Sequence, residues 1–215
     1  MECQVNEVYP CLMGESLAVG LKATLVRLAG CNLHCRYCDT RYATSESGVP
    51  RTIESLIEEI ARQGFGRMLL TGGEPMLQKE PALQLMERCV GESIDVHLET
   101  NGSLPLSEVP KAATKVVDIK TPGAKSGGVF LLDNLSALNA KDQLKFVITS
   151  KEDFRWSEAF IKEHSLAIPE SHLLFSPAFG DVDPKDLADW VLASPLDIRL
   201  HIQIHKTIWG EKRGV

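Results

Sequence analysis

Strand-like and helix-like segments alternate along the whole of this 215-residue sequence, and that alternation constrains its fold more than any other feature. Residues 22–30 read as a strand rich in Val, Leu and Thr, and residues 52–64 read as an amphipathic helix. The order then repeats to the end of the chain. Further strands are expected at 67–75, 94–102, 115–120, 144–149, 173–176 and 198–205, with helices at 80–90, near 130–139, from Ser150 and from Pro184. Strand–helix alternation at this spacing predicts an α/β fold with a mainly parallel sheet, closing into a barrel or partial barrel.

Polar and glycine-rich clusters directly follow five of these strands. They occupy residues 31–40, 71–75, 99–102, 118–123 and 176–180. Sites in parallel α/β folds gather at the carboxyl ends of the strands. The sequence therefore predicts one composite site built from all five clusters.

Net charge and hydropathy limit the kinds of molecule that we expect this protein to bind. The net charge is -6, which argues against a nucleic-acid surface that works by neutralising phosphates, although local basic residues can still hold a small anion. No run of 18 apolar residues and no basic, apolar leader is present, so we expect neither a membrane span nor a signal peptide. We expect a cytoplasmic protein, in which clustered cysteines are more often metal ligands or redox groups than disulfides.

Three of the six cysteines lie close together, with the spacing Cys31-x3-Cys35-x2-Cys38. A disulfide is a weak explanation, because three is an odd number and the expected compartment is reducing. A structural zinc site usually needs four protein ligands, and only His34 lies nearby. An iron–sulfur cluster is the third possibility. Three thiolates would leave one iron open, and an open metal position is typical of a catalytic site.

The triplet, with the aromatic Tyr37 before its last cysteine, resembles the cluster loop of radical S-adenosylmethionine (SAM) enzymes. The resemblance implies a [4Fe–4S] cluster on the three cysteines whose open iron chelates SAM, which is then cleaved to a 5′-deoxyadenosyl radical. The stretch "TGGEP" at 71–75 resembles the motif that binds the SAM amino group in such enzymes. Glycines allow close backbone approach, and the Glu74 carboxylate complements an ammonium. Alone, this stretch would be a turn with an exposed Glu.

Further motifs narrow the resemblance to the 7-carboxy-7-deazaguanine synthase family. They are "MGES" at 13–16, Gly20, "LVRLAGCNL" at 25–33, "CDT" at 38–40 and "QIHKTIWGEKRGV" at 203–215. The resemblance covers residues 5–215, so we expect one radical SAM domain over residues 1–215. It implies a partial (β/α)6 barrel, with some helices reduced to loops where the helix signal is weak, at 103–114 and 121–139.

The same resemblance implies the chemistry. The family is a carbon–nitrogen lyase of queuosine and deazapurine biosynthesis. It contracts the ring of 6-carboxy-5,6,7,8-tetrahydropterin to 7-carboxy-7-deazaguanine and releases ammonia. The resemblance further implies catalytic use of SAM, dependence on Mg²⁺, a reductant such as flavodoxin, and a homodimer. Since the radical is generated on SAM, no protein side chain is expected to be catalytic itself.

Two residues can be read physically beside the resemblance. Arg27 lies mid-strand between Val26 and Leu28, where a charge is costly unless paired, and a substrate carboxylate is a natural partner for it. An Arg on the solvent face of an amphipathic strand is the alternative. Thr40 follows Asp39, and the resemblance places its oxygen on Mg²⁺, bridging to the substrate carboxylate. A Thr that merely stabilises a turn is the alternative there.

The resemblance assigns the remaining contacts. Substrate contacts are implied for Leu12, Met13, Gly14, Glu15, Arg27, Thr71, Glu99 and His205. SAM contacts are implied for Tyr37, Cys38, Asp39, Gly73, Glu74, Asp118, Ile119, Lys120, Ser176, Pro177, Ala178 and Phe179. The family often has Gln at position 13, so any contact by Met13 should involve backbone or packing. In some relatives the C-terminal carboxylate meets the substrate, which leaves a role open for Val215.

Two other functions compete with this interpretation. A small activating enzyme that makes a glycyl radical on a partner protein shares the triplet and "GGEP", but Arg27 and Thr40 favour a small molecule. A zinc-binding interaction module is the non-enzymatic alternative. Cys3, Cys11 and Cys89 have no ligand spacing, so we expect them to be buried apolar thiols.

Overall fold

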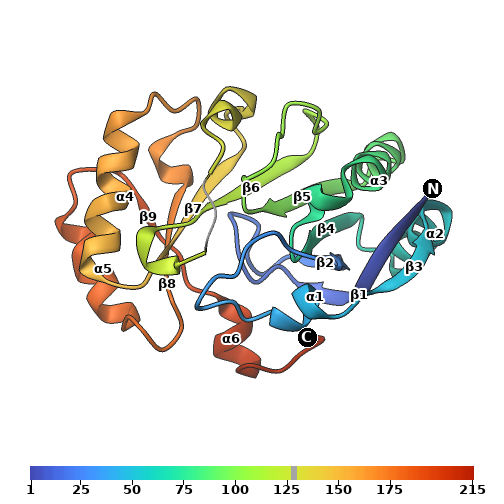
Figure 1. Cartoon of the computed structure of the whole chain (residues 1–215), viewed down its shortest axis with the longest axis horizontal. Helices are drawn as coiled ribbons and strands as arrows, with labels where there is room; N and C mark the ends of the chain where they lie inside the picture. The colour runs from blue at the N-terminus through green and yellow to red at the C-terminus, as the bar shows by residue number, and fades with distance from the viewer. Residues whose placement is uncertain (127–129) are drawn as a thin grey trace.

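A single mixed sheet organises the chain (Figure 1). In the computed structural model, which describes residues 1–126 and 130–215, the sheet has nine strands in the order β3-β1-β2-β4-β5-β6-β7-β8-β9. The strands from β2 to β9 are parallel, whereas β1 is antiparallel to both β2 and β3. The expected α/β fold with a mainly parallel sheet is confirmed, and the sheet is not closed. The bounds are β1 Glu2–Leu12, β2 Lys22–Leu28, β3 Val49–Thr52, β4 Arg67–Gly72, β5 Asp95–Thr100, β6 Thr114–Ile119, β7 Gln143–Ile148, β8 Leu173–Pro177 and β9 Arg199–Leu200.

The helices lie near the two ends of the sheet in Figure 1, with α2 and α3 beside the early strands and α4 and α5 beside the late ones. The residues at the ends of α2 and at the start of α4 are those that the sequence predicts. The Thr52 side chain accepts a hydrogen bond from the Ser55 N–H at the start of α2, and Ser150 caps α4 in the same way. Gly64 ends α2 at a φ of 71°. The bounds are α1 Arg41–Ser45, α2 Ile53–Gln63, α3 Lys79–Gly91, α4 Lys151–Glu163, α5 Pro184–Ala193 and α6 Ile204–Trp209.

Loops and short 3₁₀ segments replace α-helices in the regions where the sequence shows a weak helix pattern. Between β5 and β7 the described residues contain no α-helix, only the short 3₁₀ segments Pro122–Ala124 and Leu132–Ala137. Two further 3₁₀ segments, Pro75–Gln78 and Glu170–His172, lie elsewhere. Residues 127–129, part of the predicted weak region at 121–139, lie outside the described residues.

The predicted last strand is wrong beyond its first residues. Only Arg199–Leu200 pairs with β8, and α6 begins at Ile204. The alternation of 198–205 therefore does not separate a core face from a solvent face: His201 is buried, while Ile202 is 39% exposed. Pairing stops at Phe175 although β8 continues to Pro177, which has no N–H for a further ladder bond.

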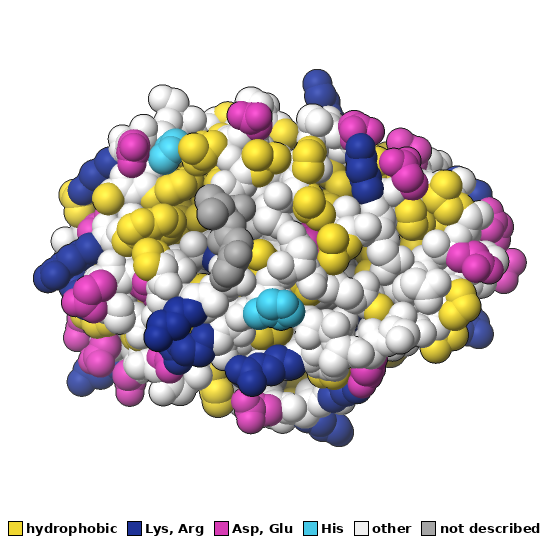
Figure 2. Space-filling model, viewed as in Figure 1, with side chains coloured by type: hydrophobic (Ala, Val, Ile, Leu, Met, Phe, Trp, Pro, Cys, Tyr) yellow, Lys and Arg dark blue, Asp and Glu magenta, His cyan; other side chains and the backbone are white. Residues whose placement is uncertain are grey.

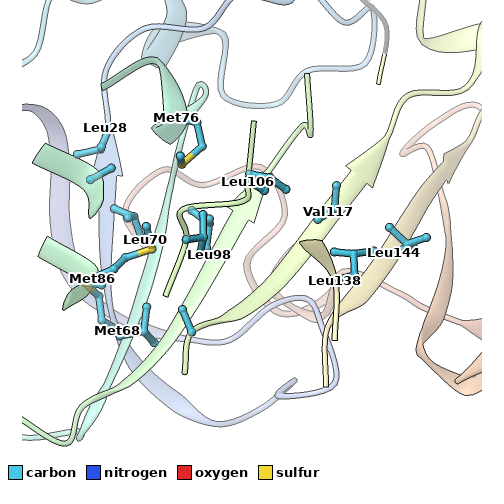
Figure 3. Packing of buried hydrophobic residues seen from close by; sticks show 14 of the residues in the cluster. Leu28, Met68, Leu70, Met76, Met86, Leu98, Leu106, Val117, Leu138 and Leu144 are labelled. Carbon is cyan, nitrogen blue, oxygen red and sulfur yellow. The ribbon is translucent and has the colours of Figure 1, made fainter. Parts of the chain in front are cut away.

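The main core lies between one face of the sheet and the helices (Figure 3). Val26 and Leu28 belong to this core, whereas Arg27 faces the other way, into a pocket. The three isolated cysteines are buried as expected, and burial raises the pKa of Cys3 to about 11 and those of Cys11 and Cys89 to about 12. None of the helices in the described parts of the chain is long and apolar enough to cross a membrane.

Candidate functional site

A pocket of about 290 Å³ opens where the parallel strands end, on the face of the sheet opposite the main core. All five polar clusters contribute to its wall, so the predicted composite site is one cavity. The loop between β2 and α1 forms one side, and the C-terminal segment 210–215 forms part of the rim. The chain therefore brings residues more than 180 positions apart to one place.

The three clustered cysteines all line this pocket as free thiols. Burial raises the pKa of Cys31 and of Cys35. Among the described residues, no three His, Cys, Asp or Glu side chains gather closely enough to hold one metal ion. A [4Fe–4S] cluster does not need such a gathering, because each thiolate binds a different iron. Three soft donors on one loop beside an open cavity thus fit a cluster better than a single zinc ion.

Close packing positions the cysteine loop on the end of β4. A Cβ added at Gly73 would lie 2.1 Å from the Gly30 carbonyl oxygen and 2.8 Å from the Cys31 Cβ. Gly72 has a φ of 157°, and a Cβ there would lie 2.3 Å from the Leu28 carbonyl oxygen. The glycines are therefore needed to bring the two strand ends together.

Glu74 directly follows the two glycines at the end of β4, and its side chain is held by hydrogen bonds. It is fully buried and does not line the pocket. Its carboxylate instead accepts hydrogen bonds from the Thr100 hydroxyl at 2.8 Å and from the backbone N–H groups of Met76 and Asn101, at 2.9 and 2.7 Å. In this arrangement Glu74 ties the end of β4 to the end of β5. The contact between Glu74 and SAM stays a prediction.

The wall near the cysteines carries unpartnered polar atoms. Asp118 pairs with Lys120 at 3.0 Å through Oδ2, while its Oδ1 is buried with no hydrogen-bond partner. The buried Tyr37 hydroxyl also lacks one. Because buried polar atoms are normally satisfied, this wall suits a ligand that supplies hydroxyl or amino groups, as SAM does. Segment 176–179 completes this side, but the buried Ile119 side chain lies in the main core instead.

The opposite wall carries a buried cation. Arg27 donates from Nε to Glu7 at 2.9 Å, and the Tyr42 hydroxyl donates to the same oxygen at 3.0 Å. Burial would lower the pKa of Arg27, but its neighbours Tyr42, Tyr9 and Glu7 leave that pKa raised, so the guanidinium stays charged. The alternative of an Arg on a solvent face is wrong.

Two carboxyl groups of the pocket, those of Glu15 and Glu99, have pKa values that are shifted in opposite directions. Burial raises the pKa of Glu15, but the Lys145 ammonium outweighs it and leaves that pKa well below its usual range. Burial, and then the Glu15 charge, raise the pKa of Glu99 to about 7. Glu99 accepts a hydrogen bond from the Thr71 hydroxyl at 3.1 Å. The pocket thus holds one carboxylate that stays ionised and one that takes a proton near neutrality.

Thr40 lines the pocket beside the cysteines and precedes α1. Its hydroxyl makes no capping hydrogen bond to that helix and lies 3.8 Å from the Cys38 sulfur. The alternative of a turn-stabilising Thr therefore lacks its hydrogen bond. The neighbouring Asp39 pairs with Lys206 of α6 at 2.9 Å.

Four more predicted residues lie at or directly after the end of β1 and in α6. His205 lines the pocket against Gly14, where a Cβ would lie 2.0 Å from the His205 Nδ1. Leu12 also lines it, whereas Met13 is buried in a second small core with Cys11 and Leu25. The Met13 side chain therefore packs in a core and does not line the pocket.

The C-terminal segment is fastened over the rim by one side chain. Arg213 donates to Glu7 and, at 3.1 Å, to Glu46, and its guanidinium lies 3.8 Å from the centre of the Tyr42 ring. Glu7 therefore joins Arg213 to Arg27. Val215 lines the pocket as well.

Sequence reasoning missed several residues of this site. Lys145 stands alone among apolar residues of β7, the same signal that singled out Arg27. Glu7, Tyr42 and Arg213 gave no such signal, because β1 was not predicted and their contacts join distant parts of the chain.

Comparisons with known proteins agree on one family. The model of the radical SAM superfamily matches residues 25–125. The 7-carboxy-7-deazaguanine synthase of Koribacter versatilis is 39% identical, with 99% of this chain and 100% of that protein covered. The protein of the same name from Chlorobaculum tepidum is 35% identical, covering 98% and 96%. The crystal structure of QueE from Escherichia coli matches with a TM-score of 0.80 at 21% identity, covering 94% of each chain.

Proposed function

This chain belongs to the 7-carboxy-7-deazaguanine synthase family of radical SAM enzymes, and from that membership we propose its reaction. The proposed reaction converts 6-carboxy-5,6,7,8-tetrahydropterin to 7-carboxy-7-deazaguanine and ammonia, in queuosine or another deazapurine pathway. One observation carries the proposal: the cysteine triplet, the buried cation Arg27 and the ionised Glu15 line the same pocket. We also propose that residues 1–215 form one radical SAM domain.

The cofactors follow from the donor atoms in the pocket. The proposed [4Fe–4S] cluster is held by Cys31, Cys35 and Cys38, and with SAM bound to its open iron it supplies the radical that starts the reaction. Asp118, Tyr37 and Lys120, with segment 176–179, would bind the rest of SAM, because this wall offers the unpartnered polar atoms. Thr40 is the proposed protein ligand of Mg²⁺, since its hydroxyl makes no capping bond.

The substrate would lie between Arg27 and Glu15. The hydrogen bond to Glu7 uses Nε of Arg27, which leaves N–H donors of the terminal amino groups for the substrate carboxylate. Glu15 is ionised and accepts, so it suits the guanidine-like N–H edge of the pterin. Glu99 with Thr71, and His205, would bound the ring on the remaining sides. The Arg213 contacts hold the tail over the rim and limit entry of water.

The reductant must reach the cysteine loop from outside. His34, Arg36 and Arg41 of the loop and α1 are exposed, and Figure 2 shows Lys, Arg and His side chains on the face that it displays. We propose that an acidic electron-transfer protein such as flavodoxin approaches here, because opposite charges favour encounter. The homodimer remains a proposal that rests on the family resemblance, and the cytoplasmic location remains a proposal as well.

The proposal is tested by anaerobic turnover. The protein is reconstituted with iron and sulfide, then supplied with the carboxytetrahydropterin, SAM, Mg²⁺ and a chemical reductant. The expected product is a deazapurine identified by its absorbance and mass, with ammonia released. Cleavage of SAM without a deazapurine would show that the substrate assignment is wrong. The rival activity on a glycyl-radical protein is less favoured, because Arg27 and Thr40 line the same pocket as the cysteines, as a small carboxylate substrate with Mg²⁺ would require.

A further inference from the structure

Lys145 lies between two carboxylates that belong to different parts of the pocket. It is a residue of β7, directly opposite Asp118 of β6 in the parallel register. Its ammonium contacts Glu15 Oε2 and lies 3.2 Å from Asp118 Oδ2. All three side chains are nearly buried, with 10–13% of each exposed. One cation therefore holds two acidic groups that come from separate loops and strands.

The two carboxylates keep free acceptor capacity toward the pocket. Glu15 has one oxygen on Lys145 and the other on the Gln203 amide, yet a carboxylate can accept about four hydrogen bonds. Asp118 Oδ1 is buried and has no partner. Glu15 lies near Glu99, which bonds to Thr71 and is influenced by the Arg27 charge, whereas Asp118 lies near Tyr37 and Cys35. Each carboxylate is thus positioned for a different ligand.

Charge balance explains why a cation is needed at this point. Glu99 lies close enough to Glu15 for the two charges to repel, and Lys145 attracts both. Burial would lower the pKa of Lys145, but Glu15 and Asp118 keep that pKa well above its ordinary value. Lys120 contacts Asp118 and cannot replace Lys145 at Glu15, which has no other ion-pair partner among the described residues.

Resting on the proposed function, we propose that Lys145 is a positioning residue that couples the pterin half of the pocket to the SAM half. Its ammonium fixes Glu15 toward the pterin edge and Asp118 toward SAM in one arrangement. Binding of either ligand then depends on the same side chain. Lys145 itself needs no contact with a reacting atom for this role.

The test measures ligand affinity in the cluster-reconstituted protein. In Lys145→Met, the Kd values of the carboxytetrahydropterin and of SAM should each rise roughly ten- to a hundredfold, because hydrogen bonds to charged groups are the strong ones. More 5′-deoxyadenosine should form per deazapurine. Unchanged Kd values for both ligands would overturn the inference.

A double variant separates positioning from a structural role. If Lys145 acts through Glu15, Glu15→Gln with Lys145→Met should bind the pterin no more weakly than Glu15→Gln alone. This double variant also removes the unpaired Glu15 charge, so it keeps the test available even where Lys145→Met alone does not fold. Additive losses of pterin affinity would overturn the inference. Lys145→Arg keeps the charge and should restore stability, while the longer, planar group leaves pterin affinity reduced.

A matched control lies on the neighbouring strand. Lys115 of β6 is 1% exposed and pairs with Asp142 at 2.8 Å, away from the pocket. Lys115→Met should lower the free energy of unfolding without changing either Kd; equal losses of affinity in Lys115→Met and Lys145→Met would overturn the inference. A wild-type protein that binds both ligands but makes no deazapurine would contradict the proposed function alone.

Discussion

The Nε of Arg27 lies 2.9 Å from the Glu7 carboxylate, and Arg27 lines the same pocket as the three cysteines. Glu7 also accepts from Tyr42 and Arg213, so one carboxylate orients the buried cation and fastens the tail. This arrangement fixes the direction of the guanidinium before any substrate arrives. Preorganisation of this kind reduces the entropy lost on binding.

Arg27→Lys should impair substrate binding although it keeps the charge, because an ammonium cannot bind a carboxylate in the bidentate way. We expect the KM for the carboxytetrahydropterin to rise roughly tenfold or more, with reductive SAM cleavage retained. Arg67→Lys is the matched control, since Arg67 also pairs with a carboxylate, Asp95 at 2.8 Å, but does not line the pocket. An unchanged KM in Arg27→Lys would contradict the assignment.

The contacts of Arg213 predict an effect on how tightly SAM cleavage is coupled to formation of the deazapurine. Arg213→Ala removes the contacts with Glu7, Glu46 and the Tyr42 ring, so the rim should open more readily. More 5′-deoxyadenosine should then form for each deazapurine, as quantified by chromatography. Arg62→Ala, which breaks an exposed ion pair with Glu59 on α2, should leave that ratio at the wild-type value. Equal ratios in all three proteins would show that the tail does not guard the pocket.

Replacement of Gly73 should weaken cluster binding although all three cysteine ligands are unchanged. Gly73→Ala places a methyl group 2.1 Å from the Gly30 carbonyl oxygen, so the cysteine loop must shift. Iron and sulfide content after reconstitution should fall well below the wild-type value. Gly91→Ala is the control, because nothing lies within 4 Å of a Cβ there. Full iron content in Gly73→Ala would contradict the packing argument.

The raised pKa of Glu99 predicts how stability depends on pH. With the pKa at about 7 instead of 4.5, folding takes up a proton between these values. The free energy of unfolding therefore falls as pH rises from about 4.5 to about 7, by up to about 1.4 kcal/mol per pH unit. Urea unfolding of wild type and Glu99→Gln at pH 5, 6 and 7 measures this. The free energy of unfolding of wild type should exceed that of Glu99→Gln by a smaller amount as pH rises. A difference that does not change with pH would contradict the raised pKa of Glu99.

The sequence predicted the parallel strands and the gathering of their carboxyl ends, because both follow from local periodicity. It did not predict β1, since the stretch 2–12 mixes apolar and polar residues irregularly and includes Pro10. That strand becomes intelligible only beside its antiparallel neighbours β2 and β3. The strand predicted at 198–205 was wrong for a related reason. Alternation of apolar and polar residues does not reveal how far the neighbouring strand β8 can pair with it.

Residue types were easier to predict than their partners. Arg27 and Thr40 could be singled out from their neighbours in the sequence, and both line the pocket. The ion pair of Lys145 with Glu15 spans 130 positions, which no local pattern encodes. The hydrogen bonds of Glu74 to the β5 end and to Met76 could not be predicted, because they depend on how β4 and β5 align.

The central claim is that this pocket performs radical chemistry on the carboxytetrahydropterin, and isotope transfer tests it most directly. The substrate carries deuterium at C6, and SAM recovered after anaerobic turnover is analysed by mass spectrometry. The account predicts deuterium in the recovered SAM, because the 5′-deoxyadenosyl group takes hydrogen from C6 and SAM is regenerated. Deazapurine formation with unlabelled SAM, or SAM cleavage with all deuterium left in unreacted substrate, would contradict it.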